Sequence, residues 1–332
     1  MLARPRRNRR TAPVRALVRE PLVRPGQLVH PVFLLPGEGR REGIAHLGGY
    51  PRLSADEAER EIDELLALGV RSFVAFPAVP DVHKDRAASF GASPDNFYLH
   101  AARRWKDRYG DEIVLVSDVA MDPYSSDGHD GLVEGRRIVN DATLPILADM
   151  GVAQAQAGFD YLGPSDMMDG RVRHLRKALD EAGHSECGIV SYTAKYASAL
   201  YGPFRQALDS APRADSEAPA HKRSYQMDPA NRREALREAA LDEAEGADLL
   251  MVKPALHYLD VISDLRQNTP LPVAAYHVSG ECAMLLGAIE RGWLGEEAIA
   301  ETITCLGRAG AQVILTYVAR QYAAQYVELA GG

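Results

Sequence analysis

Two lysines stand out because this chain otherwise uses arginine for its cations. Only six of the 38 lysine and arginine residues are lysines. Lys253 follows the apolar run LLMV, and Lys195 lies in SYTAKYAS at the end of another β-rich run. A buried ammonium is costly, so such a lysine either pairs with an acid or becomes a neutral amine, which attacks carbonyl carbons. A salt bridge readily explains one strand-end lysine, but two in neighbouring strands favour Schiff-base chemistry.

Eight short β-rich runs alternate with helical patterns along the chain. The runs cover residues 28–34, 72–76, 112–118, 159–165, 187–192, 247–253, 272–279 and 312–317. Helical patterns, with apolar residues three and four apart, cover 54–69, 142–158, 170–183 and 231–247. Near-continuous apolar strands that alternate with helices predict a parallel sheet covered on both faces. Because no GxGxxG turn follows the first strand, we predict an α/β fold of the (β/α)8 TIM-barrel type rather than a Rossmann sheet.

A barrel of this type places its active site at the carboxyl ends of the strands. Polar residues lie at the carboxyl ends of six consecutive predicted strands, and they are Asp118, Ser165 with Asp166, Lys195, Lys253, Ser279 and Tyr317. Convergence of these side chains on one opening predicts a polar pocket. The alternative for Ser165 and Asp166 is that they cap the helix that follows them.

Composition narrows the class of protein. A net charge of −8 and a pI near 5.7 argue against a nucleic-acid-binding surface, and no stretch approaches the roughly 18 apolar residues of a membrane span. The three cysteines, Cys187, Cys282 and Cys305, cannot form a disulfide framework, which favours the reducing cytoplasm.

The first 24 residues hold eight arginines and one acid, Glu20. A transit peptide and a nucleic-acid-binding arm are possible readings, but the segment has no serine and no secretory apolar region. We interpret it as a solvated arm that lies on a neighbouring subunit.

Several long strings resemble the porphobilinogen synthase (5-aminolevulinate dehydratase) family. They are SDVAMDPYSSDGHDG, GPSDMMDGRV, SYTAKYASALYGPFR, YQMDPANRREALRE, GADLLMVKPALHYLD and AAYHVSGE. The resemblance implies a TIM barrel over 28–332 and an N-terminal arm over 1–27 that embraces a neighbour, commonly in a homo-octamer. It implies a lyase of tetrapyrrole (heme) biosynthesis, which condenses two molecules of 5-aminolevulinate to porphobilinogen with loss of two waters. No organic cofactor is expected.

The resemblance also assigns roles within the site. Lys253 is expected to form a Schiff base with the first substrate and Lys195 with the second. The substrate-binding positions are Ser279 and Tyr317 for one carboxylate, Arg205, Lys222 and Gln226 for the other, and Asp118 with Ser165 near an amino group. Lys222 stands where arginine is common, which keeps the cation but loses the bidentate fork. The proline, alanine and charge content of the segment 205–226 predicts an active-site lid, and an ordinary disordered loop is the alternative.

The resemblance also indicates which kind of metal site to expect. Three cysteines bind zinc in one branch of the family, and here those positions are Ala120, Asp122 and Asp130. The absence of soft ligands excludes a Cys₃ zinc site, whereas Asp122 and Asp130 suit magnesium if any metal binds. A polar turn without metal is the alternative. Glu238 matches the position of an allosteric magnesium ligand in magnesium-responsive members of the family. The alternative is that Glu238 is a solvated acid on the surface of a helix, with i,i+4 ion pairs to its neighbours.

Asp127, Cys282 and the segment 44–54 depart from the family pattern. They leave open a divergent paralogue, either an aldolase-type enzyme that acts on another keto substrate through one lysine, or a non-catalytic assembly or regulatory protein. The sequence as a whole leaves open whether the product feeds general heme supply or a specialised pathway.

Overall fold

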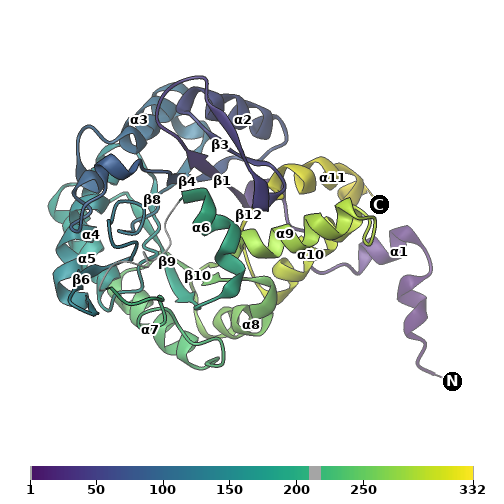
Figure 1. Ribbon diagram of the computed structural model, residues 1–332. Coiled ribbons are helices and arrows are strands. Elements are labelled where there is room, and N and C mark those ends of the chain that lie inside the picture. Colours follow the sequence, from purple (N-terminus) through teal and green to yellow (C-terminus); the bar gives the residue numbers. More distant parts are fainter. Residues whose placement is uncertain (1, 209–217, 332) are drawn as a thin grey trace.

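The computed structural model describes residues 2–208 and 218–331, and its centre is a closed barrel of eight parallel strands (Figure 1). The strands, in barrel order, are β1 (Leu28–Leu34), β4 (Ser72–Pro77), β5 (Val114–Val116), β8 (Tyr161–Leu162), β9 (Gly188–Lys195), β10 (Leu249–Lys253), β11 (Val273–His277) and β12 (Val313–Thr316). Pairing of β12 with β1, where Leu28 lies beside Ile314, closes the barrel. The predicted TIM barrel is confirmed.

Each predicted β-rich run overlaps a barrel strand, although the bounds differ: most strands are shorter than their runs, and β9 extends beyond its run to Lys195. The run 159–165 forms a strand only at Tyr161–Leu162. In β1 all seven residues are buried, as expected for a strand with the barrel interior on one side and helices on the other. The apolar core therefore occupies both faces of the sheet.

An outer ring of helices surrounds the strands (Figure 1). It consists of α2 (Ala55–Ala67), α3 (Phe97–Tyr109), α4 (Asn140–Gln156), α5 (Arg171–Glu181), α7 (Glu234–Glu245), α8 (Leu259–Asn268), α10 (Glu297–Ala309) and α11 (Ala319–Gly331). The four helices predicted from periodicity are α2, α4, α5 and α7. Two more helices, α6 (Gly202–Leu208) and α9 (Ser279–Glu290), pack against each other, and α6 lies over the barrel opening in Figure 1.

Two short antiparallel hairpins were not predicted. One joins β2 (Arg41–Ile44) to β3 (Tyr50–Leu53), and β3 also pairs with β1. The other joins β6 (Leu132–Glu134) to β7 (Arg137–Val139). Their sequences are short and mostly half-buried or exposed, so they lack the continuous apolar pattern of the barrel strands. The first hairpin contains the divergent segment 44–54 and brings the Tyr50 ring edge-on to Tyr317, 5.1 Å between centroids.

The chain near its N-terminus extends away from the barrel (Figure 1), whereas Val23, closer to β1, is buried and its carbonyl accepts a hydrogen bond from Tyr322. A 3₁₀ turn at Pro5–Arg9 and helix α1 (Ala12–Leu17) contain no buried residue. Within the predicted lid, residues 209–217 lie outside the described residues, so the structure describes only its flanks. In the part of the chain that the structure describes, no helix is both long and apolar enough to cross a membrane.

Candidate active site

Lys253 lies in an aromatic pocket at the carboxyl end of β10. Its side chain is buried, and its Nζ lies 4.6–5.3 Å from the centroids of four rings, which belong to Tyr276, Tyr192, Phe204 and Tyr201. Within the described residues it has no carboxylate in ion-pair distance. Burial, and then the charge of Lys195, lower the pKa of Lys253 to about 7. A large fraction of this amine is therefore neutral and nucleophilic at neutral pH.

Lys195 ends the neighbouring strand β9 and is paired in register with Lys253. Its surroundings differ, because its Nζ lies 3.6 Å from Asp130 Oδ1 and donates a hydrogen bond to the Ser165 carbonyl. Lys195 thus has an anionic partner that Lys253 lacks. The two amines share one pocket in unequal electrostatic settings, which suits two different steps of one reaction.

Asp118 and Ser165 form a hydrogen-bonded pair beside the lysines. The Ser165 hydroxyl donates to Asp118 Oδ1 at 2.7 Å, and both side chains are buried. Burial, and then the nearby Asp122, raise the pKa of Asp118 to about 7. Both protonation states of this carboxyl are therefore accessible near neutral pH, as acid–base catalysis requires.

Ser165 and Asp166, which could have capped the following helix, have different hydrogen-bond partners. Ser165 uses its hydroxyl on Asp118 rather than on a helix end. Asp166 accepts a hydrogen bond from the Met168 backbone N–H at 2.7 Å, in a turn that precedes helix α5. Asp166 therefore shapes this loop, whereas Ser165 faces the pocket residues.

The residues expected to bind carboxylates fall into two groups. Arg205, Lys222 and Gln226 line one cavity of about 230 Å³, and the buried Gln226 Oε1 has no hydrogen-bond partner there. Ser279 and Tyr317 instead touch the aromatic pocket. The Ser279 hydroxyl accepts from the Phe204 N–H, and the Tyr317 hydroxyl lies 3.0 Å from that of Tyr276. The first group lies near Lys195, because Lys222 and Lys195 both approach Asp130. The second group lies near Lys253, whose amine the rings of Phe204 and Tyr276 surround.

Lys222 occupies the place between the two acids that were candidates for magnesium. Its Nζ lies 2.9 Å from Asp122 Oδ2 and 2.8 Å from Asp130 Oδ2, and the Tyr225 hydroxyl donates to Asp130 at 2.9 Å. These pairings compensate the carboxylates with an ammonium, so a divalent cation would have to displace Lys222. Among the described residues, no group of three or more metal-binding side chains converges. The donor set of Asp122 and Asp130, already paired with Lys222, does not fit a metal ion.

Comparison with known proteins decides the family. A protein-family profile described as Delta-aminolevulinic acid dehydratase matches residues 2–325. The chain belongs to the delta-aminolevulinic acid dehydratase family. The chloroplastic enzyme of that name from Chlamydomonas reinhardtii is 49% identical over 321 residues, covering 95% of this chain and 82% of the relative. The Chlamydia pneumoniae relative is 44% identical over 317 residues, covering 95% and 94%.

A solved structure extends the likeness to three dimensions. Delta-aminolevulinic acid dehydratase (porphobilinogen synthase) from Toxoplasma gondii, in complex with its reaction product porphobilinogen, matches with a TM-score of 0.95 and 44% identity. The match covers 100% of this chain and 94% of that one. Both the family and the fold predicted from the sequence are confirmed.

In this delta-aminolevulinic acid dehydratase family member, the aromatic pocket is the part of the site that sequence reasoning missed. Its members are Tyr192, Tyr201, Phe204 and Tyr276. Tyr192 and Tyr276 were visible inside predicted strands, but a search for titratable and nucleophilic residues passes over aromatic ones. Only the register of β9, β10 and β11 shows that they face Lys253.

Proposed function

We propose that this chain condenses two molecules of 5-aminolevulinate to porphobilinogen with release of two waters, the hydro-lyase step of tetrapyrrole (heme) biosynthesis. The observation that carries the proposal is the pair of buried lysines in register at the ends of β9 and β10. An aldolase-type enzyme needs one such lysine, whereas a condensation of two ketones has a use for both.

The chemistry follows from the two settings of the lysines. The neutral amine of Lys253 adds to the keto carbon of one substrate, and the keto oxygen leaves as water. Lys195 does the same with the second substrate, which accounts for both waters. A carbon of one substrate, losing its C–H protons, then bonds to the imine carbon of the other, and a substrate amino nitrogen, losing an N–H proton, bonds to the remaining imine carbon. Both lysines leave as amines and take up the protons that the substrates lose, including the ring C–H proton lost on aromatisation. The faces of the aromatic rings stabilise the cationic iminium at Lys253 by cation–π interaction. The rings also exclude water that would hydrolyse the iminium.

The remaining polar residues bind and orient the two substrates. Arg205, Lys222 and Gln226 bind the carboxylate of the substrate at Lys195, and a carboxylate there replaces one acid partner of Lys222. Ser279 and Tyr317 bind the other carboxylate beside Lys253. Asp118 and Ser165 hold a substrate amino group, and Asp118 accepts and returns a proton, as its pKa near 7 allows.

The pH dependence of imine formation at Lys253 tests this assignment. Only the neutral amine adds to a ketone, so the initial rate of borohydride trapping of 4-oxopentanoate should rise about tenfold per unit below a midpoint near pH 7 and level off above it. Peptide mapping by mass spectrometry after quenching between pH 5.5 and 9.5 measures the fraction trapped at Lys253. A rate that keeps rising beyond pH 9, as for an ordinary lysine with pKa near 10.4, would contradict a Lys253 perturbed by burial and Lys195.

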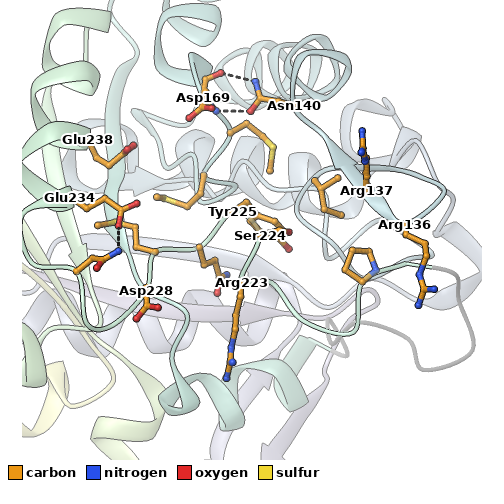
Figure 2. A pocket seen from close by; sticks show the side chains of 17 residues that line it. Arg136, Arg137, Asn140, Asp169, Arg223, Ser224, Tyr225, Asp228, Glu234 and Glu238 are labelled. Atoms are coloured by element: carbon orange, nitrogen blue, oxygen red, sulfur yellow. Dashed lines mark hydrogen bonds between the residues drawn. The ribbon is translucent and has the colours of Figure 1, made fainter.

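Glu238 offers a better setting for magnesium than the Asp122 segment does. It lies on α7, half-buried, and lines a cavity of about 680 Å³ with Glu234 and Asp169 (Figure 2). Burial raises the pKa of Glu238, and the buried Arg171 opposes the effect. One or two carboxylates facing a roomy cavity suit a magnesium ion that keeps most of its waters. We propose such an ion here, which supplies positive charge for assembly and takes no part in the chemistry at the lysines.

An activity assay with metal exchange tests function and metal together. Porphobilinogen is read by its colour with an acidic aldehyde reagent after treatment with EDTA alone, EDTA then magnesium, or EDTA then zinc. We expect magnesium, but not zinc, to raise activity about fivefold or more. A factor of five is the lower end of the change that one site usually causes at another site coupled to it. Glu238→Gln should remove the response, whereas Glu301→Gln, an exposed acid on α10, should keep it.

The outcomes separate the two proposals. Product in every sample, with an unchanged magnesium response in Glu238→Gln, would contradict the metal site alone. Absence of porphobilinogen in all samples of folded protein would contradict the function. Sedimentation velocity on the same samples reports whether magnesium favours the larger assembly.

The N-terminal arm supports assembly as a homo-oligomer. Leu17 on α1 is exposed in a helix without buried residues, which suits a segment that packs on a neighbour. We propose that the arm embraces an adjacent subunit in a homo-octamer. The free cysteines Cys187, Cys282 and Cys305 fit the reducing cytoplasm as the location. We propose no nucleic-acid or membrane partner.

A further inference from the structure

Strand β9 contains one residue more than its neighbour, and this irregularity decides where Lys195 points. Ser191 pairs with Leu250, but Ala194 pairs with Val252, so three steps along β9 match two along β10. The register shift indicates a β-bulge, in which Tyr192 and Thr193 lie between the paired residues Ser191 and Ala194.

Without the bulge, Lys195 would face away from the pocket. Side chains alternate along a regular strand, so 191, 193 and 195 would share one face. The Ser191 and Thr193 hydroxyls both donate to Asp242 of the outer helix α7, whereas the Tyr192 ring faces Lys253 inside the barrel. Lys195 nevertheless reaches the interior, at the carbonyl of Ser165. The extra residue reverses the alternation and turns Lys195 inward.

A buried polar cluster holds the bulge from the outside. The Asp242 carboxylate accepts the Ser191 hydroxyl at 2.6 Å and also the Thr193 hydroxyl. The Arg171 guanidinium lies 3.3 Å from Asp242 Oδ2 and donates to the Tyr192 carbonyl, at the bulge itself, at 3.3 Å. The side chains of Ser191, Thr193, Asp242 and Arg171 lie outside the barrel interior, and all four residues are buried. A buried ion pair is by itself weak evidence for stability, but this one also contacts the backbone at the bulge.

We propose that Asp242, Arg171 and the Thr193 hydroxyl form a bulge clamp, a set of positioning residues that directs Lys195 into the barrel beside Lys253. The consequence for catalysis rests on the proposed function, in which Lys195 binds the second substrate. None of the three side chains needs to touch substrate. They act on Lys195 by fixing the backbone of β9 at Tyr192 and Thr193, which lie within three residues of Lys195 in the sequence.

Thr193→Val is the main test, because valine keeps the branched shape and removes only the hydroxyl. We expect porphobilinogen formation to fall about 100-fold, the cost of a misplaced reactive group. Thr193→Ser restores the hydroxyl and should recover most of the rate. The matched control is Asp248→Asn, which removes a carboxylate that also binds β9, at the Ile189 N–H, but far from the bulge. Asp242→Asn is a secondary variant, since it leaves the Arg171 charge buried without its partner.

A second readout reports the position of Lys195 independently of turnover. The Lys195 charge lowers the pKa of Lys253, while Asp118, Asp122 and Asp130 raise it. If Thr193→Val turns Lys195 away, the midpoint for borohydride trapping of 4-oxopentanoate at Lys253 should move up, toward that of Lys195→Met. Thermal unfolding by circular dichroism identifies variants that are merely unfolded.

Three outcomes decide the matter. A raised midpoint with lost turnover in Thr193→Val, both restored in Thr193→Ser and absent in Asp248→Asn, supports the bulge clamp. A wild-type midpoint and rate in folded Thr193→Val overturns it. If wild-type protein makes no porphobilinogen, the proposed function fails, yet the midpoint shift still tests whether the clamp positions Lys195.

Discussion

We expect the Lys253→Met variant to lose porphobilinogen formation by about 10⁴-fold or more, as when an essential nucleophile is removed. Methionine is close to lysine in length and suits the aromatic pocket of Tyr192, Phe204 and Tyr276, so the barrel should stay folded. The variant lacks the amine that forms the imine. Borohydride with 4-oxopentanoate should therefore leave no mass adduct at this position, as peptide mapping would show.

Two controls make the Lys253 result specific. Lys177→Met alters an exposed lysine that pairs with Glu181 on helix α5, and it should behave as wild type. Lys253→Arg keeps a cation in the pocket but supplies no nucleophile, and it should be as inactive as Lys253→Met. An adduct at wild-type level in Lys253→Met would show that another lysine carries the first imine.

The Lys195→Met variant should lose porphobilinogen formation by about 10³-fold or more while Lys253 still forms its imine. The second ketone then has no amine to activate it, although the first still binds. Product assay and borohydride trapping on the same sample separate the two steps. Normal turnover without Lys195 would contradict the two-lysine reaction and favour a single-lysine, aldolase-type enzyme.

Charge and nucleophilicity at Lys195 can be separated as well. Removal of its charge in Lys195→Met raises the pKa of Lys253, because a like charge no longer opposes protonation. The trapping midpoint therefore moves to higher pH, and the neutral fraction at pH 7 falls. Lys195→Arg keeps the charge, so the midpoint should stay near 7 while turnover is lost. An unchanged midpoint in Lys195→Met would mean that burial alone perturbs Lys253.

The same trapping experiment addresses the non-catalytic paralogue. Asp127 lies 3.6 Å from Arg86, and Cys282 packs 3.2 Å from His277 Nδ1, so each departure from the family pattern has a local partner. Neither contacts Lys253 or Lys195 in the described structure. Among the described residues, Lys253 is buried without an acid partner, which is costly in a pocket that has no catalytic function. Absence of any reducible imine in folded protein would favour the non-catalytic paralogue.

The sequence by itself determined the barrel strands, because strands buried on both faces read as continuous apolar runs whatever their neighbours are. It also identified Lys253 and Lys195, since lysine is rare in this chain and both follow such runs. Long motif strings predicted the family, which the comparisons confirmed. These signals are local, so each can be read from a short window of residues.

The tertiary structure alone decided what surrounds the two amines. The aromatic pocket joins Tyr192, Phe204 and Tyr276 from three separate segments, and Lys222 meets Asp122 across 100 positions of sequence. The bulge in β9 is invisible to a pattern search, because an extra residue has meaning only against the strand beside it. Side-chain direction and pKa depend on register, closure and burial, which are properties of paired strands and not of a strand's own sequence.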